Sequence, residues 1–154
     1  MSSQLPRFKY ALETKEPRTG PGGITRGASV KEFPASVGIA GVSMRLQAGT
    51  MREPHWHANA VEWAYVIEGT LRITEQFEAG DIGYAPMGSG HYIKSTGKEV
   101  CKILIGFNSG YYQAIDLSAW LASIPNDLLA GNFGIDGALI DEFPIQKTFL
   151  LPKS

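Results

Sequence analysis

Cysteine and histidine are scarce in this chain: its 154 residues include one cysteine, Cys101, and three histidines. A single cysteine excludes a disulfide within the chain, and its position in the apolar run 100–107 predicts a buried thiol. No apolar run is long enough to span a bilayer, and the N-terminal residues lack the apolar core of a secretory signal. We therefore expect a cytoplasmic protein that has no contact with a membrane.

An excess of charge of either sign is also missing. Fourteen basic and fifteen acidic side chains leave a net charge of -1, which argues against binding to nucleic acid or to an anionic membrane surface. Hydrophobic residues make up 44% of the chain. A chain of this size buries roughly two thirds of its unfolded surface, so the composition indicates a single domain with one core and no nucleic-acid partner.

All three histidines fall in two short stretches of sequence. His55 and His57 stand two residues apart, so in a strand both imidazoles point to the same face. Glu62 does not share this spacing, but a turn at the small residues 58–60 would return it to the same place. His91 would arrive from a distant strand, after a series of glycine and proline turns. Three imidazoles and one carboxylate form a donor set that metal ions select, so we predict a metal site at these four residues.

Most of the remaining sequence reads as short strands separated by Gly, Pro, Asn and Ser turns. Short strands at such spacing are typical of a sandwich or a jelly roll. The segment before them, up to about Pro34, is rich in Gly and Pro, and we expect an irregular arm there with a short strand near Ile24. The predicted strands cover residues 37–46, a few residues around Trp56, and residues 62–68, 71–74, 82–85, 91–94 and 100–107.

The hydrophobic period changes in the C-terminal part of the chain. Apolar residues repeat with helical spacing over residues 117–124, with Asp116 or Ser118 available as the N-cap and Pro125 at the end. We expect this helix to be a packing surface, either against its own barrel or against a partner subunit. The other predicted elements are a short helix through Leu128 and Leu129 that ends by Gly131 or Gly134, and an edge strand within residues 145–151.

The two histidine-containing stretches resemble the two motifs of the cupin superfamily. Residues 49–69 have the spacing G-x5-H-x-H-x4-E-x6-G, and residues 80–91 have G-x5-P-x-G-x2-H. The sequence around them is similar to one domain of the oxalate decarboxylases. The resemblance implies an all-β fold with minor α content, a double-stranded β-helix or jelly-roll barrel, in a homo-oligomer held by its C-terminal helices. It places an N-terminal arm at residues 1–35, the barrel at 36–110, and a C-terminal helical hairpin with an edge strand at 111–154, all in one domain overall.

The same resemblance implies a function. It is that of a Mn2+-dependent protein acting on oxalate or a similar small carboxylate, with the ion held by the three histidines and Glu62. The donor types suit Fe2+, Zn2+ or Ni2+ as well. Arg52 is the predicted catalytic residue, because a guanidinium there would grip or polarise a carboxylate beside the metal. Since Arg52 and His55 differ in strand parity, this role requires a bend near Pro54.

Two positions depart from the oxalate decarboxylases that the sequence resembles. Those enzymes transfer protons through a glutamate on the loop after the last barrel strand, whereas the matching residues 108–113 contain no acid. A second glutamate position of those enzymes is occupied by Ile105. Three alternatives therefore stay open: a decarboxylase, an oxidase, which returns no proton to carbon, or a non-catalytic metal-containing cupin that binds a small acid or sugar.

Overall fold

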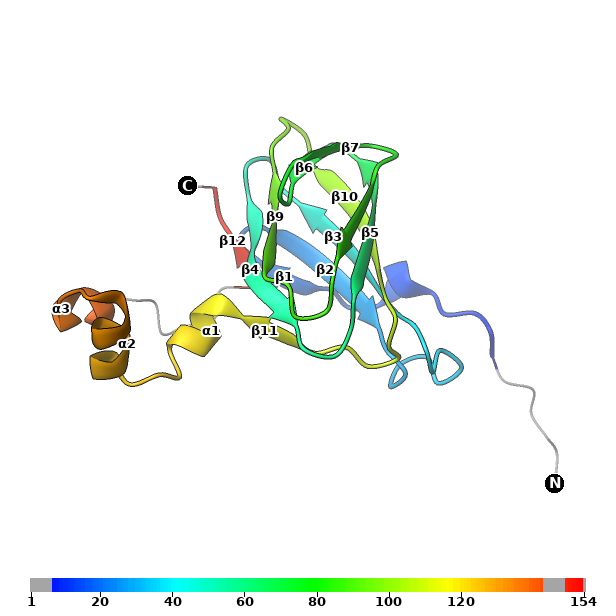
Figure 1. The fold of residues 1–154 in the computed structure, drawn as a ribbon. Coiled ribbons are helices and arrows are strands. Elements are labelled where there is room, and N and C mark those ends of the chain that lie inside the picture. The colour runs from blue at the N-terminus through cyan, green and yellow to red at the C-terminus, as the bar shows by residue number, and fades with distance from the viewer. Residues whose placement is uncertain (1–6, 143–148, 154) are drawn as a thin grey trace, which may run out of the picture.

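Two antiparallel β-sheets face each other and enclose the core of the protein (Figure 1). The computed structural model describes residues 7–142 and 149–153. The first sheet has the order β1 (Arg18–Gly20), β2 (Gly23–Ala28), β3 (Ala40–Leu46), β10 (Cys101–Phe107), β5 (Glu62–Glu68) and β8 (Ile82–Ala85). The second has the order β11 (Ala114–Asp116), β4 (Met51–His57), β9 (His91–Ser95), β6 (Thr70–Arg72) and β7 (Gln76–Glu78), and β12 (Leu150–Leu151) pairs with β4.

The core forms because the central strands alternate between buried side chains and side chains that are mostly half-buried. In β3 every second residue from Ala40 to Leu46 is buried, and β10 follows the same pattern from Cys101 to Phe107. The two strands pair in a register that sets Cys101 opposite Leu46, so their buried faces coincide. The expected buried thiol is confirmed, because Cys101 is fully buried, and this burial raises its pKa to about 11.

The N-terminal segment is more regular than its glycine content suggests. A short 3-10 helix (Leu12–Thr14) precedes β1 and β2, and these two strands form a hairpin that extends the first sheet beside β3. The predicted short strand near Ile24 is confirmed as part of β2. Gly23 starts this strand with a φ of 149°, and a Cβ there would lie 2.0 Å from the carbonyl oxygen of Arg45. Glycine at this position permits close contact between β2 and β3. From composition alone, the same glycine indicates a loop.

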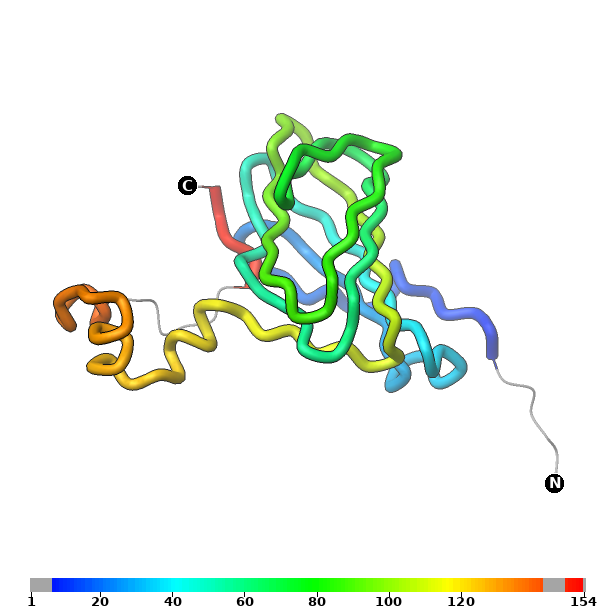
Figure 2. Tube along the Cα trace, viewed as in Figure 1, coloured from blue at the N-terminus to red at the C-terminus, as the bar shows by residue number. Residues whose placement is uncertain are grey.

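The C-terminal part leaves the barrel and then returns to it. Three short helices, α1 (Leu117–Leu121), α2 (Asn126–Phe133) and α3 (Gly137–Asp141), project from one end of the barrel (Figures 1 and 2). The first is shorter than predicted, α2 ends at Gly134 in the left-handed conformation as expected, and α3 was not predicted. Within the predicted edge strand, β12 pairs with β4, while residues 145–148 lie outside the described residues. No helix in the described part of the chain is long and apolar enough to cross a membrane.

Candidate metal centre

The four side chains with metal-ligand chemistry lie together inside the barrel. His55 and His57 come from β4, Glu62 starts β5 and His91 starts β9. One donor atom from each of them lies within 4.8 Å of every other, and all four side chains are buried. The i, i+2 spacing places both β4 histidines on the inner face, and the register of β4 with β9 sets His55 opposite His91. The structure therefore brings together the four residues that the sequence singles out.

Backbone carbonyl groups fix the orientation of all three imidazoles. The Nδ1 atom of each histidine lies within hydrogen-bond distance of a carbonyl oxygen, and a carbonyl can only accept. Nδ1 must therefore carry a proton in each ring, which directs Nε2 of His57 and His91 toward the Glu62 carboxylate. The carbonyl groups belong to Glu53 for His55 (2.8 Å), Gln113 for His57 (3.1 Å) and Ser89 for His91 (3.0 Å).

One oxygen of Glu62 lies between two imidazole nitrogens, 3.0 Å from Nε2 of His57 and 3.3 Å from Nε2 of His91. Burial raises the pKa of Glu62, but the hydrogen bonds from these two histidines outweigh it and leave the pKa at about 2. The carboxylate is therefore ionised at neutral pH. Its Oε2 atom and the two nitrogens, with Nδ1 already occupied, are arranged to share a cation at their centre.

The pKa values of His55 and His91 are shifted in opposite directions. Burial lowers the pKa of His55 to about 3, and the charge of Arg52 acts in the same direction. Burial also lowers the pKa of His91, but its hydrogen bond to Glu62 outweighs this effect and the pKa is raised. His55 therefore keeps a neutral imidazole, which is the form that binds metal ions.

A β-bulge in β4 turns Arg52 toward the interior of the barrel, where the metal-site residues lie. The pairing of β4 with β9 shifts register between Arg52 and His55, and Arg52 and Glu53 are both buried although they are adjacent in sequence. The bend that the sequence analysis requires near Pro54 is thus present. The Arg52 side chain is 3% exposed and donates a hydrogen bond from Nη2 to the carboxylate of Asp116.

Glu53, which is also buried, holds the start of α1. Its Oε2 atom accepts hydrogen bonds from the backbone nitrogen of Ser118 at 3.2 Å and from the Ser118 hydroxyl at 2.6 Å. Its other oxygen lies 3.9 Å from Nη1 of Arg52 and accepts no hydrogen bond within the described residues. Glu53 thus fixes the start of α1 against the metal-site strand and adds a negative charge behind Arg52.

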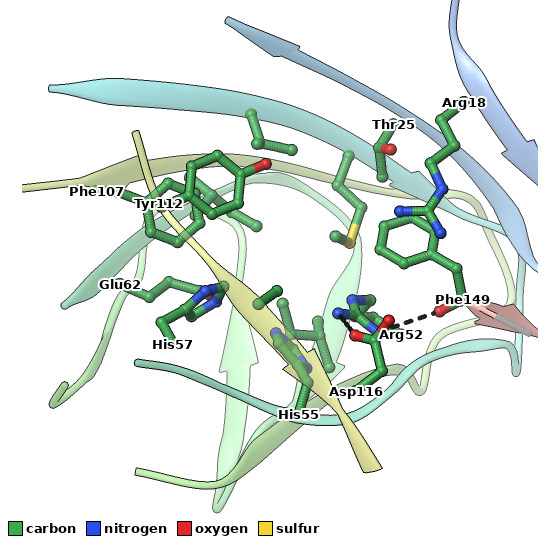
Figure 3. A pocket seen from close by; sticks show the side chains of 15 residues that line it. Arg18, Thr25, Arg52, His55, His57, Glu62, Phe107, Tyr112, Asp116 and Phe149 are labelled. Carbon is green, nitrogen blue, oxygen red and sulfur yellow. Dashed lines mark hydrogen bonds and ion pairs between the residues drawn. The ribbon is translucent and has the colours of Figure 1, made fainter. Parts of the chain in front are cut away.

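Three of the four metal-site residues, His55, His57 and Glu62, line a cavity of about 280 Å³ (Figure 3). Arg52, the predicted catalytic residue, lines it together with Ile105, whereas other lining residues were not predicted. Asp116 was considered as a helix cap, yet its side chain makes no cap hydrogen bond and pairs with Arg52 instead. The other lining residues that sequence reasoning missed include Arg18, Tyr112 and Phe149.

The loop after β10 contributes an aromatic wall to this cavity. Tyr112 stacks on Phe107 with 3.9 Å between ring centroids, and both rings contact the His57 imidazole. The loop supplies no carboxylate, in agreement with its sequence. Among the described residues that line the cavity, Asp116 and Glu62 are the two acids.

The comparisons with known proteins agree with this geometry. The family model described as Cupin matches residues 10–141, so the chain belongs to the cupin family. It is 32% identical over 150 residues to oxalate decarboxylase OxdC of Bacillus subtilis, covering 91% of this chain and 39% of that protein. It is also 27% identical over 139 residues to germin-like protein subfamily 2 member 2 of Arabidopsis thaliana, covering 79% of this chain and 63% of the relative.

The solved structures give the same result for the fold. A structure of Bacillus subtilis oxalate decarboxylase at pH 4.6 superimposes with a TM-score of 0.92 and 31% identity, over 97% of this chain and 42% of that chain. A second structure of that enzyme, from work on its Mn(II) centres, has a TM-score of 0.92 and 30% identity over 97% of this chain and 43% of that one. The jelly-roll prediction is confirmed. The chain spans about two fifths of the length of these oxalate decarboxylases.

Proposed function

We propose that His55, His57, Glu62 and His91 hold a Mn2+ ion and that the adjoining cavity binds oxalate or a similar small carboxylate for conversion. The observation that carries this proposal is the convergence of four buried donor atoms within 4.8 Å, three of them from residues that line a cavity together with Arg52. The similarity to oxalate decarboxylases, one of which has Mn(II) centres, supports it.

The donor set fits manganese. Three imidazoles whose Nδ1 protons are fixed by carbonyl groups, with one ionised carboxylate, suit Mn2+, and also suit Fe2+, Zn2+ or Ni2+. When bound, the ion would supply a Lewis acid and a redox centre next to the substrate. Only metal analysis of the purified protein distinguishes these ions.

Arg52 is the proposed substrate-orienting residue. Its guanidinium is held from one side by Asp116 and lies 4.3 Å from the centroid of the Phe149 ring, so few orientations are available to it. A guanidinium held in this way can donate hydrogen bonds to a carboxylate in the cavity. Because its orientation is set before the ligand arrives, little conformational entropy is lost on binding.

The charges that line the cavity favour an anion. Without a metal ion, Arg18 and Arg52 are balanced by Glu62 and Asp116. A divalent cation would make the sum positive, and it would stay positive even with Glu53, which contacts Arg52 from outside the cavity. A small dicarboxylate or its singly protonated form would neutralise this excess.

The reaction type depends on proton transfer. Removing CO2 from hydrogen oxalate leaves an electron pair on carbon that must receive a proton, and the loop of residues 108–113 offers no acid for it. Oxidation of oxalate by dioxygen, which gives two molecules of CO2 and one of hydrogen peroxide, returns no proton to carbon and requires no such step. The alternative to both is a metal-containing cupin that binds a small acid or sugar without turnover, and the apolar side chain of Ile105 in the cavity wall favours it.

Carbon-13 NMR of labelled oxalate, incubated in air at mildly acidic pH with Mn2+-loaded protein, tests the proposal. Formation of formate would establish a decarboxylase, and CO2 without formate would establish an oxidase. If oxalate stays intact with the fully Mn2+-loaded protein, turnover is contradicted. The remaining interpretation is then a cupin that binds a small acid or sugar without converting it. The Arg52→Ala variant should retain the metal and lose carboxylate affinity or turnover, and an unchanged variant would contradict the role of Arg52.

A further inference from the structure

We propose that Arg18 is a second anion-binding residue of the cavity and that the preferred ligand is a dicarboxylate longer than oxalate, with one acidic group beside Arg52 and the other at Arg18. This inference rests on the proposed carboxylate-binding function and specifies the class of ligand. Arg18 belongs to β1, far in sequence from the metal-site motifs, and it lines the same cavity as the metal-site residues.

The position of Arg18 is set by an aromatic ring that it shares with Arg52. The guanidinium carbon of Arg18 lies 3.6 Å from the centroid of Phe149, and that of Arg52 lies 4.3 Å from the same centroid. The two guanidinium groups are therefore within about 8 Å of each other. Figure 3 shows Arg52 on the side of the histidines and Arg18 farther from them, beyond the Phe149 ring. A ligand that extends from the metal site past Arg52 would reach Arg18.

Charge distinguishes Arg18 from the other arginines nearby. Arg52 is paired with Asp116, and Arg26 and Arg45 of the neighbouring strands both contact Glu13. Arg18 makes no ion pair with a carboxylate anywhere in residues 7–142 and 149–153. A cationic side chain at a cavity wall, held by an aromatic ring and without a carboxylate of the protein, is a suitable partner for an acidic group of the ligand.

The size of the cavity also exceeds what oxalate requires. At the roughly 30 Å³ that one water molecule occupies in the liquid, about 280 Å³ accommodates about nine non-hydrogen atoms. Succinate and its close relatives come near to that number, whereas oxalate leaves a third of the space to water. Val42 and Met44 line the wall and offer apolar contacts to methylene groups between the two carboxylates.

Binding measurements with acetate and succinate test the role of Arg18. The dissociation constants of 13C-labelled acetate and succinate would be obtained from paramagnetic broadening by the Mn2+-loaded protein without oxygen. In the parent protein we expect succinate to bind at least tenfold more tightly than acetate. The Arg18→Gln variant should lose most of this ratio, and Arg18→Lys, which keeps the charge, should recover part of it. Arg72→Gln is the matched control, because Arg72 is exposed on β6 and its loss changes the net charge equally.

The outcomes separate this inference from the proposed function. A tenfold or larger loss of the succinate to acetate ratio in Arg18→Gln, but not in Arg72→Gln, would support the second anion position. Equal succinate to acetate ratios in Arg18→Gln and the parent protein would overturn the second anion position. If the parent protein still binds acetate, the proposed function stands. Failure of the loaded parent protein to bind either acid would overturn the proposed function and this inference together.

Discussion

Asp116 accepts a hydrogen bond from the guanidinium group of Arg52, and both side chains are almost fully buried at the wall of the metal-site cavity. The pair joins two strands that are far apart in the sequence, because Arg52 lies in β4 and Asp116 ends β11. Burial disfavours the charge of Arg52, and the Asp116 carboxylate opposes that effect on its pKa. The protein therefore depends on this carboxylate to keep a charged arginine inside the barrel.

Loss of Asp116 should be costly for stability. The Asp116→Ala variant leaves Arg52 buried and without its carboxylate, and we expect the free energy of unfolding to fall by about 3–5 kcal/mol. Asp116→Asn keeps an acceptor oxygen and should lose less. Urea denaturation of the metal-free proteins measures both effects. The Arg52→Ala/Asp116→Ala double variant should lose less than the sum of the two single variants, because it removes both charges.

An exposed ion pair provides the contrast. Lys102 and Glu68 lie 2.7 Å apart, with side chains 36% and 56% exposed. Solvent screens such a pair, so Glu68→Ala should cost less than about 1 kcal/mol. If Asp116→Ala cost no more than Glu68→Ala, the structural importance assigned to the buried pair would be wrong.

Removal of Glu62 should abolish metal binding. Glu62 supplies the only carboxylate among the four grouped donors, and its charge offsets that of the cation. We expect Glu62→Gln to lower the affinity for Mn2+ by roughly 100-fold or more, judged by the 10- to 100-fold losses that changes outside the ligand set already produce. Metal content after dialysis, measured by mass spectrometry, gives the result. Glu75→Gln, an exposed carboxylate of the hairpin between β6 and β7, should keep the metal, and equal retention in both variants would contradict the site.

Acid should destabilise the metal-free protein through His55. Its folded-state pKa of about 3 lies below the ordinary value of 6.5, so between these values the unfolded chain binds more protons than the folded one. The stability that this pKa difference of His55 contributes is fully present above pH 6.5 and is lost as the pH falls toward 3. Because the pKa of Glu62 is about 2 in the folded state and 4.5 ordinarily, the window from pH 6 to pH 5 lies above both values and reports mainly on His55.

The slope of the free energy of unfolding against pH, between pH 5 and pH 6, tests this prediction. One extra proton bound by the unfolded state corresponds to a loss of about 1.4 kcal/mol per pH unit, read from urea denaturation of the apoprotein. His55→Asn should remove most of the slope. NMR should also show that the His55 ring does not titrate above pH 5, while His91 stays protonated above its ordinary pKa. A His55 ring that titrates near pH 6.5 would contradict this prediction.

The grouping of His55, His57 and Glu62 could be predicted because it follows from local periodicity and one short turn. The spacing of His55 and His57 fixes their common face in any strand, and the short turn before Glu62 permits only a few return paths. Phe149 could not be predicted in the same way. It reaches Arg52 across 97 residues of sequence, after three helices that leave the barrel, and no local pattern encodes that return.

Arg52 and Asp116 show where sequence reasoning stops. The parity of Arg52 indicates that a bend is required, but only the β-bulge in the pairing of β4 with β9 shows that it exists. Asp116 precedes a helix, where an acid is commonly a cap, so its pairing with a buried arginine had no signal of its own. Both residues depend on contacts between distant strands.

Cys101 should be unreactive until the protein unfolds. Burial raises the pKa of its thiol to about 11, so little thiolate forms at pH 8, and the side chain is inaccessible at the start of β10. Iodoacetamide at pH 8 should leave the folded protein unmodified over an hour and label it completely in concentrated guanidinium chloride, as followed by intact mass. The free thiol of glutathione in the same tube is the control for reagent activity.

The homo-oligomer expected from the sequence stays a prediction, and the outer face of the first sheet gives it a test. Trp63 and Tyr65 of β5 lie beside Tyr84 and Ile82 of β8 in register, and all four side chains are at least 37% exposed. An exposed apolar patch of this kind is typical of a surface covered by another chain. Light scattering during gel filtration should give at least twice the mass of one chain. The Trp63→Lys/Tyr84→Lys variant should shift the protein toward the monomer, whereas the exposed Thr74→Lys change should not. A monomeric parent protein at 100 μM would contradict the expectation.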